Sequence, residues 1–227
     1  REISVTGSTL VYQAIVDLGP DAAAYAALER LLGASERWED LVALYERQIG
    51  LGPAADRRST LHHELGQVLE TRIVDIERAF DQYEQALRLD GQHPGTVASL
   101  EALMQKPEHA FRAATMLEDV YLARLDWRKV MVTLEARLAV CDETSERMHL
   151  LRRLAKLHEE QEENYGAALD SMAMLLGENI ADEETWDELE RLSRVANAEA
   201  RLGEIYAGEL AKKTEDDAAT AKLAMRT

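Results

Sequence analysis

An internal repeat constrains the fold of this 227-residue chain more than any other feature of its sequence. When the sequence is shifted by 89 positions against itself, Trp38 falls on Trp127 (127 − 38 = 89). From Ala24 to Leu103, 17 of 80 aligned positions are then identical without a gap, and many of these residues are apolar at helical spacing. A unit of this length that recurs predicts a fold in which similar pieces stack and cover one another's apolar faces.

Each unit has the pattern of several short helices. Helix-forming Ala, Leu, Glu and Arg are abundant, and β-branched runs of strand length are nearly absent, which predicts an all-α protein. Turn signals separate the apolar stripes, and Ser35, Asp126 and Asp182 are predicted to cap the helices that follow them. The predicted helices, about thirteen in number, cover residues 8–18, 21–33, 36–49, 55–71, 74–89, 94–105, 108–124, 126–140, 144–162, 164–177, 182–194, 197–213 and 216–226.

The 89-residue unit contains five of these helices, an odd number that does not divide into helical hairpins. Either the helix over 94–105 is an additional one, or one of the predicted boundaries splits a bent helix. The sequence does not decide between the two. We expect one domain over residues 1–227, with a superrepeat at about 19–107 and 108–196 and a capping region at 197–227. Because the chain begins with Arg1 rather than Met, we expect it to be a fragment of a longer protein.

The charge balance excludes some classes of partner. The chain has 43 acidic and 26 basic residues, a formal net charge of −17, and no basic stripe, so nucleic acid and anionic membranes would be repelled.

No apolar run approaches the roughly 20 residues of a membrane span, and the sequence contains no signal peptide. The single Cys141 rules out an internal disulfide framework, which fits a reducing compartment or a protein indifferent to redox, and we expect a cytoplasmic location.

The sequence gives no pattern for catalysis or for binding a cofactor. It has no phosphate-binding glycine loop, nucleophile elbow or zinc-protease helix. In His62-His63-Glu64 the two histidines diverge by about 100° on a helix, so one metal ion is not expected to take both. Cys141 has no histidine pattern nearby to activate it and is predicted to be structural. We therefore expect no enzymatic activity, no cofactor, no metal and no small-molecule substrate.

The tryptophans are candidates for either core packing or partner contact. Trp38 and Trp127 occupy equivalent positions near the starts of predicted helices, and we expect each to wedge against the preceding helix. The alternative is an exposed aromatic contact for a partner. Trp186 aligns with Val97 in the 89-residue frame, so it is not shared between the copies and is the stronger candidate for a contact residue.

Residues 58–91 resemble the tetratricopeptide repeat, a family of helical hairpins. The residues that carry the resemblance are Leu65-Gly66, Ala79, Tyr83 and Ala86, with one extra residue at the turn between the two helices. The pattern returns in Leu154-Ala155, Ala168 and Met172, and more faintly in Leu117-Glu118, Tyr121, Val130 and Leu134, where Glu118 replaces a small residue. The resemblance covers about two thirds of the chain and implies a right-handed α-solenoid of antiparallel hairpins. A related helical-hairpin superfamily would account for the weaker parts equally well.

In that family the first helix of each hairpin lines a groove that receives peptides or partner helices. The resemblance therefore implies a set of groove residues, to which Trp186 is added as a candidate contact. These residues are Thr60, His63, Gln67 and Glu70 from one helix, and His149, Arg152, Lys156 and Glu159 from the equivalent helix. Arg152 and Lys156 could bind a carboxylate of the partner, or could instead form ion pairs with neighbouring glutamates.

We expect a non-enzymatic protein–protein interaction module, a scaffold or adaptor that binds a protein or peptide partner. The sequence is also compatible with two alternative roles. The chain could be an accessory helical domain of a larger enzyme or signalling protein, or a structural spacer that associates with itself into a homo-oligomer.

Overall fold

The computed structural model describes residues 10–17 and 21–212 of the chain. In this part every regular element is a helix and there is no strand, which confirms the all-α prediction. Residues 10–17 are helical, inside the predicted helix over 8–18. The predicted helix over 216–226 lies outside the described residues.

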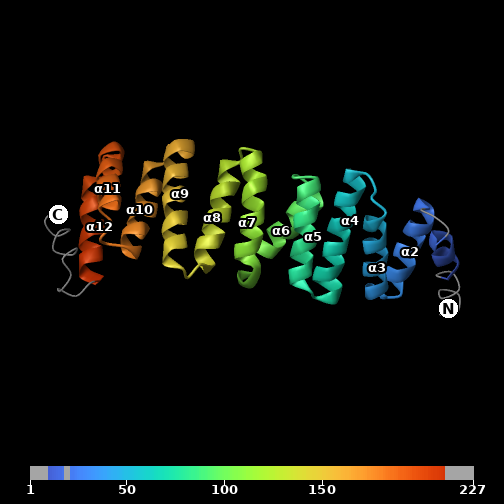
Figure 1. Ribbon diagram of the computed structural model, residues 1–227. Helices are drawn as coiled ribbons and strands as arrows, with labels where there is room; N and C mark the ends of the chain where they lie inside the picture. The colour runs from blue at the N-terminus through green and yellow to red at the C-terminus, as the bar shows by residue number, and fades with distance from the viewer. Residues whose placement is uncertain (1–9, 18–20, 213–227) are drawn as a thin grey trace. The chain divides into compact units, whose positions relative to one another are not determined.

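The chain divides into two compact units, residues 1–100 and 101–227, and each is described by itself. The single domain expected over residues 1–227 remains a prediction. The helices of unit 1 are α2 (Ala22–Ala34), α3 (Trp38–Gly50), α4 (Ala55–Val68), the π-helical turn η1 (Leu69–Ile73), α5 (Ile76–Leu89) and the start of α6 (Pro94–Met104). From α2 to α5, each helix packs against the next in chain order (Figure 1).

Unit 2 begins within α6 and continues with six further helices in the described part of the chain. These are α7 (Pro107–Ala123), α8 (Trp127–Val140), α9 (Thr144–Glu162), α10 (Tyr165–Glu178), α11 (Glu183–Ala196) and α12 (Glu199–Lys212). Here too successive helices lie side by side, and α12 contacts both α10 and α11 (Figure 1). Each of these helices begins and ends within three residues of the boundaries predicted from the sequence. Non-helical residues separate the five helices from one another in each 89-residue stretch, for example residues 90–93 between α5 and α6.

The two stretches of helices have matching boundaries. α10 begins and ends 89 positions after α5 (165 − 76 = 89 and 178 − 89 = 89), and α9 covers the range of α4 and η1 shifted by the same amount. The turns match as well, since Glu36 and Leu125 both have φ 56°, and Val74 and Glu163 have φ 64° and 51°. Few non-glycine residues adopt positive φ, so its recurrence at the same places shows that the turns are built alike.

The predicted caps are partly correct. Asp126 caps α8, and its carboxylate accepts a hydrogen bond from the Lys129 backbone N–H at 3.3 Å. Asp182 precedes α11, but its carboxylate accepts hydrogen bonds from the Thr185 hydroxyl and from Arg152 instead of capping the backbone. The Ser35 prediction is wrong, because Ser35 ends α2, where its hydroxyl donates to the Leu31 carbonyl.

A glycine in unit 1 permits close packing of α4 on α5. A Cβ atom at Gly66 would lie 2.5 Å from Cε1 of Tyr83, whose side chain is fully buried. The Tyr83 hydroxyl donates a hydrogen bond to Glu70 Oε2 at 2.7 Å, which fixes the ring. At the equivalent positions of unit 2, Ala155 stands for Gly66 and Met172 for Tyr83, so a larger residue on one helix is matched by a smaller one on the other.

Unit 2 contains a buried network of charges. Glu118 accepts a hydrogen bond from Arg137 Nη1 at 2.6 Å and pairs with Arg153 Nη2 at 2.5 Å, and Arg137 also pairs with Glu146. The side chains of Glu118 and Arg137 are only 9% and 11% exposed, and the Arg137 guanidinium lies 5.0 Å from the centre of the Phe111 ring. Glu118, which departs from the tetratricopeptide pattern, is therefore satisfied by two arginines.

The equivalent four positions of unit 1 form a network with different charges. Glu29 accepts a hydrogen bond from Gln48 Nε2 at 2.8 Å, and Arg57 lies 3.3 Å from Glu29, Gln48 and Glu64. Only the first glutamate is common to both copies, because Gln48, Arg57 and Glu64 align with Arg137, Glu146 and Arg153. Burial raises the pKa of Glu64, and Arg57 partly opposes this effect.

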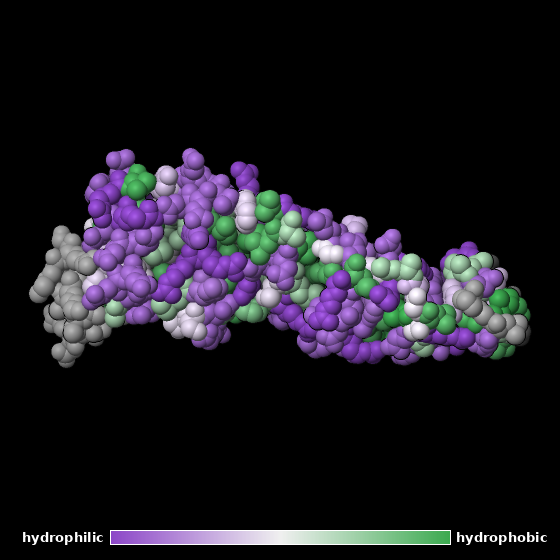
Figure 2. All heavy atoms as spheres, turned by 45° about the horizontal axis from the view of Figure 1, so that its top comes forward, coloured by the Kyte–Doolittle hydropathy of each residue, from purple (hydrophilic) through white to green (hydrophobic). Residues whose placement is uncertain are grey.

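The exposed surface is mainly polar. Figure 2 shows hydrophilic residues over much of the visible face of unit 2, with smaller groups of hydrophobic residues among them. Within the described residues, none of the helices has both the length and the apolar character needed to cross a membrane.

Candidate protein-interaction groove

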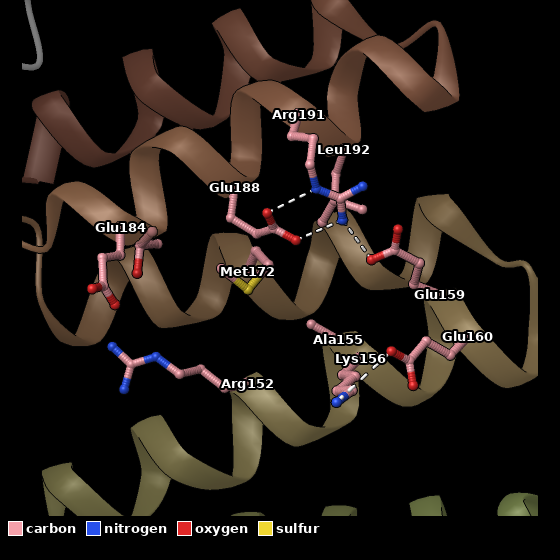
Figure 3. Close-up of a pocket in the computed structure, with 11 residues that line it drawn as sticks. Arg152, Ala155, Lys156, Glu159, Glu160, Met172, Glu184, Glu188, Arg191 and Leu192 are labelled. Atoms are coloured by element: carbon pink, nitrogen blue, oxygen red, sulfur yellow. Dashed lines mark hydrogen bonds and ion pairs between the residues drawn. The ribbon is translucent and has the colours of Figure 1, made fainter.

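Three consecutive helices of unit 2 enclose a groove of about 570 Å³. Helix α9 forms one wall, α11 forms the other, and Met172 of α10 lies between them (Figure 3). The lining residues are Arg152, Ala155, Lys156, Glu159, Glu160, Met172, Glu184, Thr185, Glu188, Arg191 and Leu192. An apolar floor between two charged walls suits a chain segment that carries both apolar and charged side chains.

The floor of the groove consists of Ala155, Met172 and Leu192, which are 5%, 5% and 1% exposed. Each belongs to a different helix, so the floor depends on the packing of α9, α10 and α11 together. Methionine has a flexible side chain that can adjust to different contacts. Met172 is therefore the floor residue best able to accommodate an incoming apolar side chain.

An arginine joins the two walls at one end of the groove. Arg191 of α11 donates hydrogen bonds to Glu188 on its own helix at 2.6 and 2.8 Å, and to Glu159 of α9 at 2.5 Å (Figure 3). The hydrogen bonds to Glu188 and then Glu159 raise the pKa of Arg191, and Arg191 in turn lowers the pKa of Glu188. Arg191 and Glu188 are thus charged at neutral pH, and Arg191 links carboxylates of both walls at this end of the groove.

Two cations of α9 line the groove, and both have exposed side chains. Arg152 pairs with Asp182 at 2.5 Å, and its side chain is 46% exposed. Lys156 lies 3.8 Å from Glu160, and both side chains are more than half exposed. Exposed pairs of this kind contribute about 0–1 kcal/mol, so a partner's carboxylate could replace Glu160 at little cost. Opposite them, Glu184 of α11 extends into the same end of the groove as Arg152 (Figure 3) and has no ion pair among the described residues.

Of the predicted groove residues in unit 2, Arg152, Lys156 and Glu159 line this groove. His149 is an exposed residue of α9 that does not line it. Trp186, the other predicted contact residue, is only 2% exposed and does not line the groove. The Tyr206 hydroxyl donates to the Trp186 carbonyl at 3.4 Å, which places Trp186 in the core where α11 packs against α12.

The corresponding space in unit 1 is filled by side chains. Tyr83 replaces Met172, and His63, which aligns with Arg152, packs against His93 and Tyr83 with ring centres 4.9 and 6.0 Å apart. A Cβ atom at Gly95 would lie 2.5 Å from His63 Nε2, so this histidine fills the space left by the glycine. His63, one of the predicted groove residues, is only 8% exposed in this packing.

The other predicted residues of unit 1 make contacts within the unit. The Thr60 hydroxyl donates to the Asp56 carbonyl at 2.9 Å, and Glu70 accepts the hydrogen bond from Tyr83. Gln67 is exposed on α4. The four positions proposed on α4 and η1 therefore do not form a site like that of α9.

Burial of His63 should make the fold sensitive to acid. Burial, and secondly the charge of His93, lower the pKa of His63 from 6.5 to about 4. The folded state thus favours the neutral imidazole, and its contribution is complete above pH 6.5 and decreases as the pH falls towards 4. Between pH 7.5 and pH 5 we expect this histidine to reduce the free energy of unfolding by about 2 kcal/mol.

This prediction is tested by urea unfolding at both pH values in the wild type and in His63→Gln. The variant has no group that titrates at position 63, so its free energy of unfolding should change with pH by about 2 kcal/mol less than that of the wild type. Equal changes in the two proteins would contradict the prediction.

His62 and Cys141, the residues considered above for metal binding and catalysis, make contacts within the chain. His62 Nδ1 lies 2.8 Å from Gln82 Oε1, and Cys141 is buried, with Sγ 3.7 Å from the Glu143 carbonyl oxygen. Among the described residues, no three His, Cys, Asp or Glu side chains are grouped so that they could hold a metal ion.

Comparison with known proteins assigns no family to the chain. No protein-family model matches it, and no curated protein matches it. The resemblance to the tetratricopeptide repeat therefore stays a prediction from sequence.

Proposed function

We propose that the chain is a non-enzymatic protein-interaction module whose groove between α9 and α11 binds a peptide or a helix of a partner protein. The observation that carries the proposal is the groove itself, with its apolar floor and its two charged walls. The larger architecture that we propose is a right-handed α-solenoid of the tetratricopeptide type. Two features support it, namely the side-by-side packing of consecutive helices within each unit and the recurrence of helix boundaries after 89 residues.

The charges of the walls suggest how a peptide would bind. A carboxylate of the peptide would pair with Lys156, whose present partner Glu160 is 3.8 Å away, and with the exposed guanidinium of Arg152. An apolar side chain next to it would contact Met172 on the floor. A basic side chain of the peptide would face Glu184 on the opposite wall. Such a ligand has an acidic, an apolar and a basic residue in close succession.

The proposal is tested with peptides selected from a random phage-displayed library on the full chain. Their affinities would be measured by fluorescence anisotropy for the wild type and for the double variant Arg152→Glu/Lys156→Glu. We expect the selected peptides to bind the double variant at least about tenfold more weakly, which corresponds to about 1.4 kcal/mol of binding free energy.

The matched control is Arg37→Glu/Arg78→Glu, which makes the same change of charge at two exposed arginines of unit 1. This control should bind the peptides as tightly as the wild type does. If both double variants lose affinity equally, the effect comes from net charge alone, and the groove is not the binding site. Unchanged affinity in both variants would exclude the groove as well.

A further inference from the structure

The two tryptophans at equivalent positions have different surroundings. In unit 1, the guanidinium carbon of Arg72 lies 4.8 Å from the centre of the Trp38 ring, a cation–π contact. The residue of unit 2 that corresponds to Arg72 is Gln161 (72 + 89 = 161). Within the described residues, no arginine or lysine stacks on the Trp127 ring. Unit 2 thus keeps the aromatic partner of this contact but lacks the cation.

A hollow of about 750 Å³ lies beside Trp127. It is formed by the turn that precedes α8 and by the end of α9 with the turn that follows it. The lining residues are Leu125, Asp126, Trp127, Arg128, Gln161, Glu162, Glu163 and Asn164. None of these residues lines the groove between α9 and α11, so the hollow is a separate site.

The charges around the hollow favour a cation. Its lining contains three carboxylates, those of Asp126, Glu162 and Glu163, and one cation, Arg128. The Arg128 side chain is 89% exposed, and its Nε lies 3.7 Å from Glu162 Oε1, so it does not fill the space. Glu162 also lies 3.1 Å from His158 Nδ1. With one positive and three negative charges, the lining has a formal charge of −2 and attracts cationic groups.

We propose that this hollow binds an arginine side chain of a partner protein. The guanidinium would stack on the indole of Trp127, as Arg72 stacks on Trp38 in unit 1, and would pair with the carboxylates of Glu162 or Glu163. A guanidinium is suited to this site because it is planar, is weakly hydrated and combines stacking with hydrogen bonding to carboxylates. The partner's arginine supplies what Arg72 supplies within the chain itself.

The test uses NMR of the full chain and follows the indole Nε1–H signal of Trp127. The probes are the peptide acetyl-Gly-Arg-Gly-amide and the same peptide with citrulline, which has nearly the same shape as arginine but no charge. We expect the arginine peptide to shift the Trp127 signal with a dissociation constant in the millimolar range, as suits a single side chain. The citrulline peptide should leave the signal unchanged.

The variant Gln161→Arg places in unit 2 the residue that unit 1 has at this position. Its guanidinium should occupy the Trp127 ring from within the chain and weaken binding of the arginine peptide at least fivefold. The control Gln67→Arg makes the same charge change at an exposed glutamine of α4 and should bind the peptide as the wild type does. Equal shifts with both peptides, or undiminished binding to Gln161→Arg, would overturn the proposal. Arginine binding at the hollow can be tested independently of peptide binding in the groove, because the two sites share no lining residue. The variant Arg152→Glu/Lys156→Glu should therefore bind the arginine peptide as the wild type does.

Discussion

Replacement of Arg137 by methionine should lower the free energy of unfolding by about 3–5 kcal/mol. Arg137 is 11% exposed and provides one of the two cations that neutralise Glu118, which is 9% exposed. Without Arg137, the buried carboxylate keeps only the pair with Arg153, and Glu146 loses its partner as well. Methionine fills much of the volume, so the loss measured would come mainly from uncompensated charge rather than from a cavity.

Two further variants separate this cause from a general effect of the substitution. In Glu118→Gln/Arg137→Met the uncompensated charge is also removed, so we expect the double variant to be more stable than Arg137→Met alone. Gln48→Met changes the equivalent position of unit 1, where one neutral donor contacts Glu29, and should cost only about 1–2 kcal/mol. The free energies of unfolding would be measured by urea titration, with circular dichroism as the readout. A loss below about 1 kcal/mol in Arg137→Met would show that the network contributes little.

The positions of the helices could be predicted from the sequence because they depend on local patterns. Apolar residues at helical spacing and clear turn signals placed α9 at residues 144–162, the range that the structure shows. The prediction failed by two residues at the start of α3, where Glu36 has φ 56° and the chain does not become helical until Trp38. No local pattern indicates that a glutamate adopts this conformation, so the boundary could not be read from the sequence.

Only the wall of the groove that α9 forms could be predicted from the sequence. Arg152, Lys156 and Glu159 recur at spacings of four and three residues, so they share one face of α9 wherever that helix packs. The opposite wall, formed by Glu184, Glu188 and Arg191, was missed because it depends on which later helix lies across the groove from α9. The sequence contains no local signal for that contact.

The burial of Trp186 could not be predicted for a different reason. Its counterpart in unit 1, Val97, is 6% exposed, and Trp186 is 2% exposed, so the position is buried in both copies. The larger, unshared side chain made Trp186 a candidate contact residue, but the structure shows a change of core volume at this position. An unshared large residue within a repeat can thus reflect different packing of the same site.

The charge networks show why the repeat is weaker in sequence than in structure. Glu29 and Glu118 are identical, but their partners differ in charge at all three remaining positions. The unit 2 set pairs two carboxylates with two arginines, whereas the unit 1 set has two carboxylates, one arginine and the neutral Gln48, so the two networks are alternative solutions for burying the same glutamate. In an alignment of the two units, the three partner positions count as mismatches. In the structure, the three partners belong to one network in each unit, so their differences are related.

The pair Gly66 and Tyr83 of unit 1 corresponds to Ala155 and Met172 of unit 2, and this exchange predicts the effect of enlarging Gly66. Gly66→Ala should lower the free energy of unfolding by about 2–3 kcal/mol, although alanine favours a helix by about 1 kcal/mol over glycine. The new Cβ would lie 2.5 Å from Cε1 and 2.8 Å from Cδ1 of Tyr83. The Tyr83 ring is fully buried and is held by its hydrogen bond to Glu70, so it cannot move aside without losing packing.

Tyr83→Met in the Gly66→Ala background would copy the pair that unit 2 has in Ala155 and Met172. Methionine alone leaves space beside Gly66 and should also destabilise unit 1. Together the two changes remove the overlap and partly refill the space, so their combined cost should be at least about 1 kcal/mol smaller than the sum of the separate costs. Urea unfolding of the four proteins measures this coupling. Additive costs would mean that the residue pairs of the two units are not interchangeable, and that Gly66 has a role other than making room for Tyr83.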